Sequence, residues 1–171
     1  GAGGENRKYP ITKYLIALKE LAKKDLVFVI VGGKSEVDDA EFIEKNLPAG
    51  KVLNLADKTT LRETEAIISQ MDYYLGSDSG VMHMAAASQV PCLVLYRDAM
   101  DKDDYCPGIY SESQRFSPWQ TKAVILRPDH ALDECKDLEA FYGWCKADEP
   151  HCITQITPQE IVTGFEALET L

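Results

Sequence analysis

The most constraining feature of the sequence is an alternation of strand-like apolar runs with segments of helical periodicity. The run "DLVFVIVGG" (25–33) is rich in β-branched residues, as in strands that are buried on both faces of a sheet. Before it, apolar residues between Ile11 and Lys24 recur at the spacing of an amphipathic helix. Short connections between such alternating elements favour right-handed βαβ units. The sequence therefore predicts one α/β domain, an open parallel sheet with helices on both faces.

The rest of the chain continues this alternation. Three helices carry start signals: Ser35 as an N-cap, Thr60 with Glu63 as a capping box, and Thr157 followed by Pro158 and Glu160. The stretch 97–120 breaks the pattern, and loops of this length are usually functional or disordered. Further strands are predicted at 51–55, 72–77, 91–96 and 122–128, and further helices at 35–47, 60–70, 80–88, near 131–140 and from 157 onward.

Composition narrows the class of protein. A length of 171 residues suits a single domain, which we place at residues 5–171, with residues 1–4 as a linker or a cloning remnant. The formal charge of −10 argues against a nucleic-acid-binding surface, and it requires local groups to hold any anionic ligand. No apolar run is long enough to span a bilayer. The odd count of five cysteines favours reduced thiols in the cytoplasm, with Cys92 in the core.

The stretch "YYLGSDSGVMHMAAASQVP" (73–91) places small polar residues between a strand and a helix. Ligands of open α/β sheets collect at the carboxyl ends of the strands, where the first N–H groups of a helix can bind an anion. Ser79 could cap the helix or donate to a phosphate, His83 could donate from the next turn, and Asp78 could accept from a sugar hydroxyl. The alternative is a simple capped turn with His83 in the core. A nucleophile elbow is excluded because Ser77 and Val81 stand where glycines are required.

This stretch resembles the signature of the bacterial family 9 glycosyltransferases, which include ADP-heptose:lipopolysaccharide heptosyltransferases. Other landmarks occur in the family's order, namely "RKYP", "VGGKSE", "LADKTTLRETEAII" and "ITPQEIV". The resemblance covers nearly the whole chain but only the family's C-terminal half. It implies a GT-B architecture of two Rossmann-like domains, of which this chain is the donor-binding one and the N-terminal acceptor domain is absent.

The resemblance also implies an activity and a set of site residues. The reaction would be inverting, metal-independent sugar transfer from a nucleotide-sugar donor, ADP-heptose by the resemblance, to a lipopolysaccharide-type acceptor, without a cofactor. The catalytic base would lie in the absent domain, so this chain alone would transfer nothing. The enzyme would be cytoplasmic, with peripheral contact to the inner membrane an open alternative. The positions implied for the donor are Arg7, Glu36, Lys58, Thr59, Asp78, Ser79, Gly80 and His83.

Alternatives remain open at this stage. After "LVLY" many relatives continue with a Gly-Pro-Thr stretch, whereas this chain reads "RDAMDKDDYCPG", which leaves the identity of the sugar undecided. A sugar-nucleotide epimerase of GT-B type or a stand-alone nucleotide- or glycan-binding module would also clamp a diphosphate. A metal site is a weak alternative, because the spacing of Cys135, Cys145 and Cys152 with His151 is not that of a zinc finger.

Overall fold

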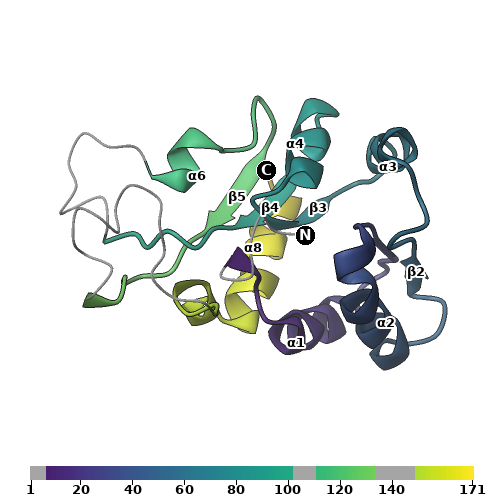
Figure 1. The fold of residues 1–171 in the computed structure, drawn as a ribbon, viewed down its shortest axis with the longest axis horizontal. Helices are drawn as coiled ribbons and strands as arrows, with labels where there is room; N and C mark the ends of the chain where they lie inside the picture. The colour runs from purple at the N-terminus through teal and green to yellow at the C-terminus, as the bar shows by residue number, and fades with distance from the viewer. Residues whose placement is uncertain (1–6, 102–110, 134–148) are drawn as a thin grey trace.

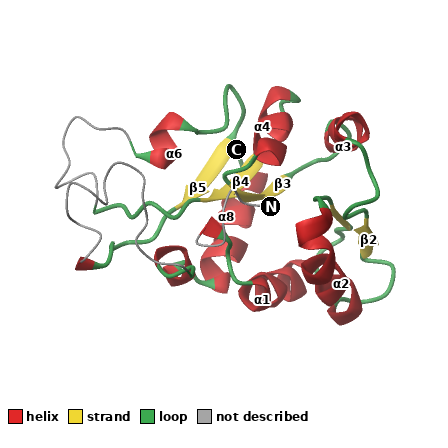
Figure 2. Ribbon diagram, in the orientation of Figure 1, coloured by secondary structure: helices red, strands yellow, loops and turns green. Residues whose placement is uncertain are grey.

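The computed structural model describes residues 7–101, 111–133 and 149–171 (Figure 1). All strand pairs in this part of the chain are parallel, and helices lie on both sides of them (Figure 2). The α/β, Rossmann-like fold expected from the sequence is confirmed. The elements are α1 (Ile11–Leu21), β1 (Phe28–Ile30), η2 (Lys34–Glu36), α2 (Val37–Asn46), β2 (Val52–Asn54), α3 (Leu61–Ile68), β3 (Tyr74–Ser77), α4 (Gly80–Ala87), β4 (Cys92–Leu95), α6 (Glu112–Arg115), β5 (Ala123–Leu126), η4 (Cys152–Gln155) and α8 (Pro158–Glu169).

The strand β4 lies at the centre of the core because both of its faces are covered. Leu93 and Leu95 pack with α1 and α8 on one face. Cys92 and Val94 pack with α4 on the other, together with Ile68 of α3. This alternation is the two-residue period of a strand, and all four residues of β4 are fully buried. Cys92 is therefore a core residue, as expected, and burial raises the pKa of its thiol to about 12.

The sheet is divided into two hydrogen-bonded pieces. One contains β1 and β2, and the other has the order β3-β4-β5. Phe28 and Ile30 of β1 and Leu75 of β3 all pack against one cluster of apolar side chains from α1 and α2, which joins the two pieces. The single open sheet of the sequence analysis is therefore corrected in this detail. The strand β1 is also only three residues long and half-buried, so the expectation that it is buried on both faces is wrong.

Most local signals of the sequence are confirmed. The capping boxes at Thr60 and Thr157 are present, and Ser79 caps α4. Ser35 is not the N-cap of α2, since it lies inside η2, and that short 3-10 turn leads directly into α2. The long loop contains the unpredicted helix α6, which Ser111 caps. The helix expected near 131–140 falls largely outside the described residues. Among the described helices, none combines the length and apolar character needed to cross a membrane.

The cap of α8 gives a direct test of the fold. Thr157 Oγ1 accepts from Glu160 N at 3.2 Å, and Glu160 Oε2 accepts from Thr157 N at 2.7 Å. Replacing Thr157 by alanine should lower the free energy of unfolding by about 1 kcal/mol, because an N-terminal amide of the helix loses its acceptor. Urea denaturation measures this. Thr163→Ala, in the exposed middle of the same helix, is the control and should be neutral or slightly stabilising.

Candidate functional site

The turn from β3 into α4 presents the start of a helix to open space. Ser79 is the N-cap, and its Oγ accepts from Met82 N at 3.4 Å. Gly80, the first residue of α4, is exposed, and a Cβ atom added to it would meet no atom within 4 Å. Its backbone is not in the left-handed region, so no strain requires glycine here. What glycine provides is room for another molecule beside the helix terminus.

A half-buried tyrosine lies beneath this turn. The hydroxyl oxygen of Tyr74 is 3.4 Å from Ser79 Oγ, and it donates to the Ser77 carbonyl oxygen at 3.5 Å. A Cβ atom at Gly76 would lie 2.2 Å from the Tyr74 Oη, so only glycine lets the phenol ring cross this strand position. Burial raises the pKa of Tyr74, which therefore stays a neutral donor. The glycine in the strand thus has a packing role that supports the Ser79 side chain from below.

Charged side chains gather around the same turn. Asp78 Oδ2 lies 3.8 Å from Arg7 Nη1, and Asp78 Oδ1 lies 3.8 Å from His83 Nε2. The His83 side chain is 47% exposed, so the alternative of a core histidine is wrong. Arg7, which precedes α1, is thereby brought to the carboxyl end of β3, 71 residues further along the chain. Arg7, Asp78 and His83 therefore lie together at this turn.

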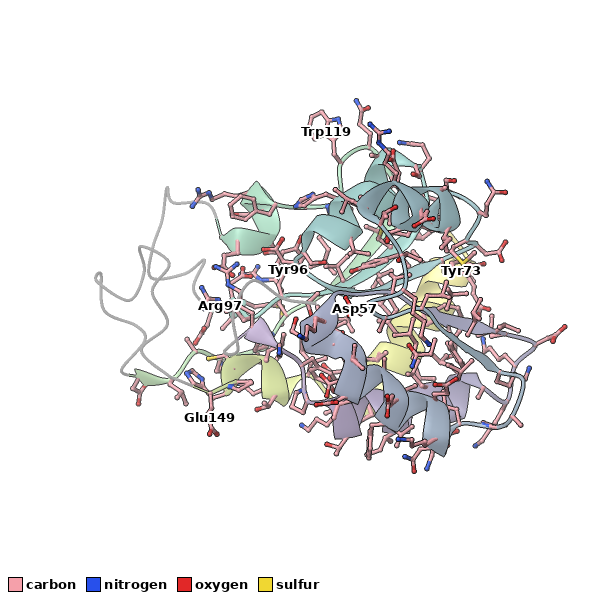
Figure 3. The ribbon with its side chains drawn as sticks, turned by 45° about the vertical axis from the view of Figure 1, so that its right-hand side comes forward. Asp57, Tyr73, Tyr96, Arg97, Trp119 and Glu149 are labelled. Carbon is pink, nitrogen blue, oxygen red and sulfur yellow. The ribbon has the colours of Figure 1, made fainter. Side chains whose placement is uncertain are left out.

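Two residues of the long loop join this group. Glu112, the first residue of α6, accepts from Arg97 Nη2 at 2.7 Å and from Arg97 Nε at 3.1 Å. Its Oε1 also accepts from Arg7 Nη2 at 3.3 Å. Arg97 lies two residues after Leu95, the last residue of β4, and Figure 3 shows it close to Tyr96. Glu112 therefore connects the carboxyl end of β4 with the segment before α1, and Arg7 in turn contacts Asp78 at the carboxyl end of β3.

A buried aspartate fixes the position of α6. Asp98 Oδ2 accepts from Ser113 Oγ at 2.9 Å and lies 3.1 Å from Arg127 Nη2. Arg127 also donates to the carbonyl oxygens of Asp98 and Ala99, so it closes the loop onto the end of β5. The other carboxylate oxygen, Asp98 Oδ1, is buried and has no hydrogen-bond partner among the described residues. Burial raises the pKa of Asp98, whereas the Arg127 guanidinium lowers it.

The electrostatics of the group are balanced. Three guanidinium groups (Arg7, Arg97, Arg127) face three carboxylates (Asp78, Asp98, Glu112) within a chain of formal charge −10. The pKa of Asp78 is raised, first by burial and then by the charge of Glu112, while Arg7 and His83 oppose the rise. A second anion next to Asp78 would raise the pKa of Asp78 further. This carboxylate is therefore better suited to accept a hydrogen bond from a hydroxyl group than to lie beside a phosphate.

The remaining predicted residues form a separate group at the ends of β1 and β2. Glu36 accepts from Gly33 N at 2.8 Å and from Ser35 Oγ at 2.7 Å. Lys58 Nζ donates to the Asn54 carbonyl oxygen at 2.9 Å, and Thr59 Oγ1 lies 2.8 Å from Thr64 Oγ1. No contact in the described residues joins Glu36, Lys58 or Thr59 to Asp78. The structure thus brings five of the eight predicted residues to one turn and leaves the other three beside the neighbouring strands.

The described residues give little support to the alternative of a metal site formed by the cysteines and His151. Cys152 Sγ lies 3.0 Å from His151 Nδ1, but Cys135 and Cys145 fall outside the described residues. Within residues 7–101, 111–133 and 149–171, no three His, Cys, Asp or Glu side chains form a group that could hold a metal ion.

Sequence reasoning missed Tyr74, Arg97 and Glu112. Arg97 had a usable signal, because it comes directly after the strand predicted at 91–96, at the edge where parallel sheets bind ligands. Tyr74 lies within a strand, and nothing in its sequence context distinguishes it from an ordinary core residue. Glu112 belongs to a loop whose path the sequence does not encode in any periodic pattern.

Comparison with known proteins supports a common origin for this arrangement. The family model "Glycosyltransferase family 9 (heptosyltransferase)" matches residues 1–140. Lipopolysaccharide heptosyltransferase 1 of Campylobacter coli is 28% identical over 100 residues, 56% of this chain and 29% of that protein. Lipooligosaccharide heptosyltransferase 2 of Haemophilus ducreyi is 25% identical over 169 residues, 96% of this chain and 44% of that protein. This chain therefore spans less than half the length of these relatives.

A solved structure shows the same fold. "Structure of E. coli ADP-heptose lps heptosyltransferase II" superposes with a TM-score of 0.72 at 24% sequence identity. The match covers 98% of this chain and 44% of the other. At this level of identity the likeness establishes the arrangement of the elements.

Proposed function

Because this chain belongs to glycosyltransferase family 9, we propose that it is the donor-binding half of a heptosyltransferase-like enzyme of lipopolysaccharide assembly. The proposed donor is a nucleoside-diphosphate sugar, with ADP-heptose the first candidate. Residues 5–171 form the donor domain in this proposal, and a preceding Rossmann-like domain supplies the acceptor site and the catalytic base. The enzyme works in the cytoplasm, where it meets a lipopolysaccharide-type acceptor at the inner membrane.

The observation that supports this best is the exposed start of α4 with Arg7 beside it. The first N–H groups of a helix form a natural site for phosphate oxygens, and the open space at Gly80 lets a diphosphate approach them. Arg7 lies within 4 Å of Asp78 in the same turn and can add a positive charge. Because the chain has a formal charge of −10, an anionic ligand needs local donors of this kind, namely helix N–H groups and a guanidinium.

The chemistry proposed for this half is stabilisation of the leaving group. As the acceptor hydroxyl displaces the nucleoside diphosphate at the anomeric carbon, negative charge grows on the bridging oxygen and the diphosphate. The amides of α4 and the Arg7 guanidinium would stabilise that charge, a kind of contribution worth about 3–4 kcal/mol for one well-placed donor. Asp78 would accept from a sugar hydroxyl, and His83 would donate from the next turn of α4. Glu36 would receive the ribose hydroxyls, with Lys58 and Thr59 beside the base.

Replacing Gly80 by alanine tests where the phosphates bind. The added methyl group meets no protein atom, so the free energy of unfolding should stay unchanged or rise slightly. The same methyl group would occupy the space before the α4 amides, and we expect the dissociation constant of ADP to rise about tenfold, measured by titration calorimetry.

The matched control is Ala87→Ser at the exposed opposite end of α4, which should bind ADP like the unaltered chain. If Gly80→Ala binds ADP equally well, the diphosphate does not sit at this turn. If the unaltered chain binds neither ADP nor ADP-heptose, the proposed donor is wrong.

A further inference from the structure

The two arginines that contact Glu112 hold it unequally. Arg97 makes two hydrogen bonds, Nη2 to Oε1 at 2.7 Å and Nε to Oε2 at 3.1 Å, which is the bidentate geometry of a strong guanidinium–carboxylate pair. Arg7 makes one longer bond to Oε1, at 3.3 Å. Of the two arginines, Arg97 thus holds Glu112 more closely, although both guanidinium groups reach the same oxygen atom.

Exposure separates the two arginines further. The Arg97 side chain is 11% exposed and the Glu112 side chain 16%, whereas the Arg7 side chain is 33% exposed. Arg97 lies just beyond the end of β4, next to Tyr96 (Figure 3), and its bonds to Glu112 hold it against α6. A buried, bidentate arginine is suited to act as a fixed counter-ion, and a more exposed arginine with longer contacts is suited to meet a ligand.

We propose that Arg97 is a positioning residue for the diphosphate site and acts through Glu112: it keeps that carboxylate from neutralising Arg7. This rests on the proposed function, in which Arg7 meets the donor. Without Arg97, Arg7 is the cation that remains in contact with Glu112 among the described residues. A partly buried carboxylate that has lost its partner closes on the next available cation. A phosphate group would then compete with the chain's own carboxylate for Arg7.

The Arg97–Glu112 pair is a feature in which this chain differs from many relatives. Arg97 stands directly after "LVLY", where the sequence departs from the Gly-Pro-Thr stretch of many relatives. Neither glycine nor proline could balance a carboxylate. Arg97 and Glu112 therefore act as a unit. The affinity for a diphosphate should be preserved when both are present or both are removed, and it should fall when Arg97 alone is removed.

Titration calorimetry with ADP on the unaltered protein and four variants tests the proposal. Arg97→Met should raise the dissociation constant about tenfold, because Glu112 then holds Arg7. Glu112→Gln should bind ADP as tightly as the unaltered protein or more tightly. The double variant, which removes the pair together, should return to within about threefold of the unaltered protein. Arg115→Met is the matched control, since it removes the same charge from α6 at an exposed position and should change nothing.

Two of these results would overturn the proposal. If Glu112→Gln weakens ADP binding, Glu112 is needed to hold Arg7 rather than being kept away from it. If the double variant binds as weakly as Arg97→Met, Arg97 acts on the ligand directly. Should Arg97→Met fail to fold, Arg97→Lys replaces it, which keeps the charge without the bidentate geometry and should give an intermediate loss.

A crystal structure of the Arg97→Met variant provides a readout that does not depend on the donor. We expect Glu112 to form a bidentate pair with Arg7 in place of the present 3.3 Å contact. If Glu112 and Arg7 keep their present positions, the proposal fails even where ADP binds. Failure of the unaltered protein to bind ADP instead contradicts the proposed function, and the variant structure still decides the role of Arg97.

Discussion

Replacing Arg7 by methionine should weaken ADP binding about 30-fold, a loss of about 2 kcal/mol. The Arg7 guanidinium lies within 4 Å of Asp78, in the open turn before α4, and a third of the Arg7 side chain is exposed. Methionine keeps much of the apolar stem but removes every donor and the charge. The loss lies at the low end for a charged hydrogen bond, because solvent screens a group that is partly exposed. Titration calorimetry measures the change in dissociation constant.

Three comparisons make this result specific to the diphosphate. Adenosine, which lacks phosphate, should bind the Arg7→Met variant and the unaltered protein equally. Arg7→Lys should recover part of the affinity, because it restores the charge without the planar fork. Arg115→Met should have no effect. Equal binding of ADP by Arg7→Met and the unaltered protein would place the phosphates away from Arg7.

Replacing Asp98 by alanine should lower the free energy of unfolding by about 3 kcal/mol. Its side chain is 2% exposed and is the partner of both Arg127 and the Ser113 hydroxyl, so truncation leaves a buried guanidinium without its carboxylate. The segment that carries α6 would lose its attachment to the end of β5, and Glu112 would lose its fixed position. Urea denaturation with an unchanged m-value is the measurement.

The control for this variant is Asp129→Ala, an exposed acidic residue on the same side of β5, which should stay within about 0.5 kcal/mol. The pH dependence of the free energy of unfolding provides a second test of the role of Asp98. Burial raises the pKa of Asp98, so the pH-dependent part of its contribution to stability is present at low pH and is lost as the pH rises through the folded-state pKa. Asp98→Asn should lack this dependence. The contacts of Asp98 with Arg127 and Ser113 remain at neutral pH, and their loss is what Asp98→Ala measures there. A loss below 1 kcal/mol for Asp98→Ala at neutral pH would contradict a structural role.

The parts of the fold that depend on local chemistry were predictable from the sequence. Thr60 and Thr157 form capping boxes because the reciprocal bonds need only four consecutive residues. The buried run of β4 and the cap at Ser79 are local in the same sense. The grouping of Asp78, Ser79 and His83 followed from one helix start. The approach of Arg7 followed only from the family resemblance.

The parts that depend on the path of a loop were not predictable. Glu112 reaches the site because Asp98 holds Ser113 at the end of β5, a contact between residues 15 positions apart with no periodic signature. Arg97 was visible as the residue after a buried strand, but its partner was not. The division between β1 and β3 likewise depends on how three-residue strands pack, which propensity does not determine.

That division has a consequence for what a bound nucleotide would do to the molecule. In the described residues, side chains around Phe28, Ile30 and Leu75 hold the two halves of the sheet together without a backbone ladder. A donor that reaches from Gly80 to Glu36 would contact both pieces of the sheet and hold β1-β2 against β3-β4-β5. Its occupancy would slow amide exchange in β1 and β2, far from the phosphates, more than in β4, which is already fully buried.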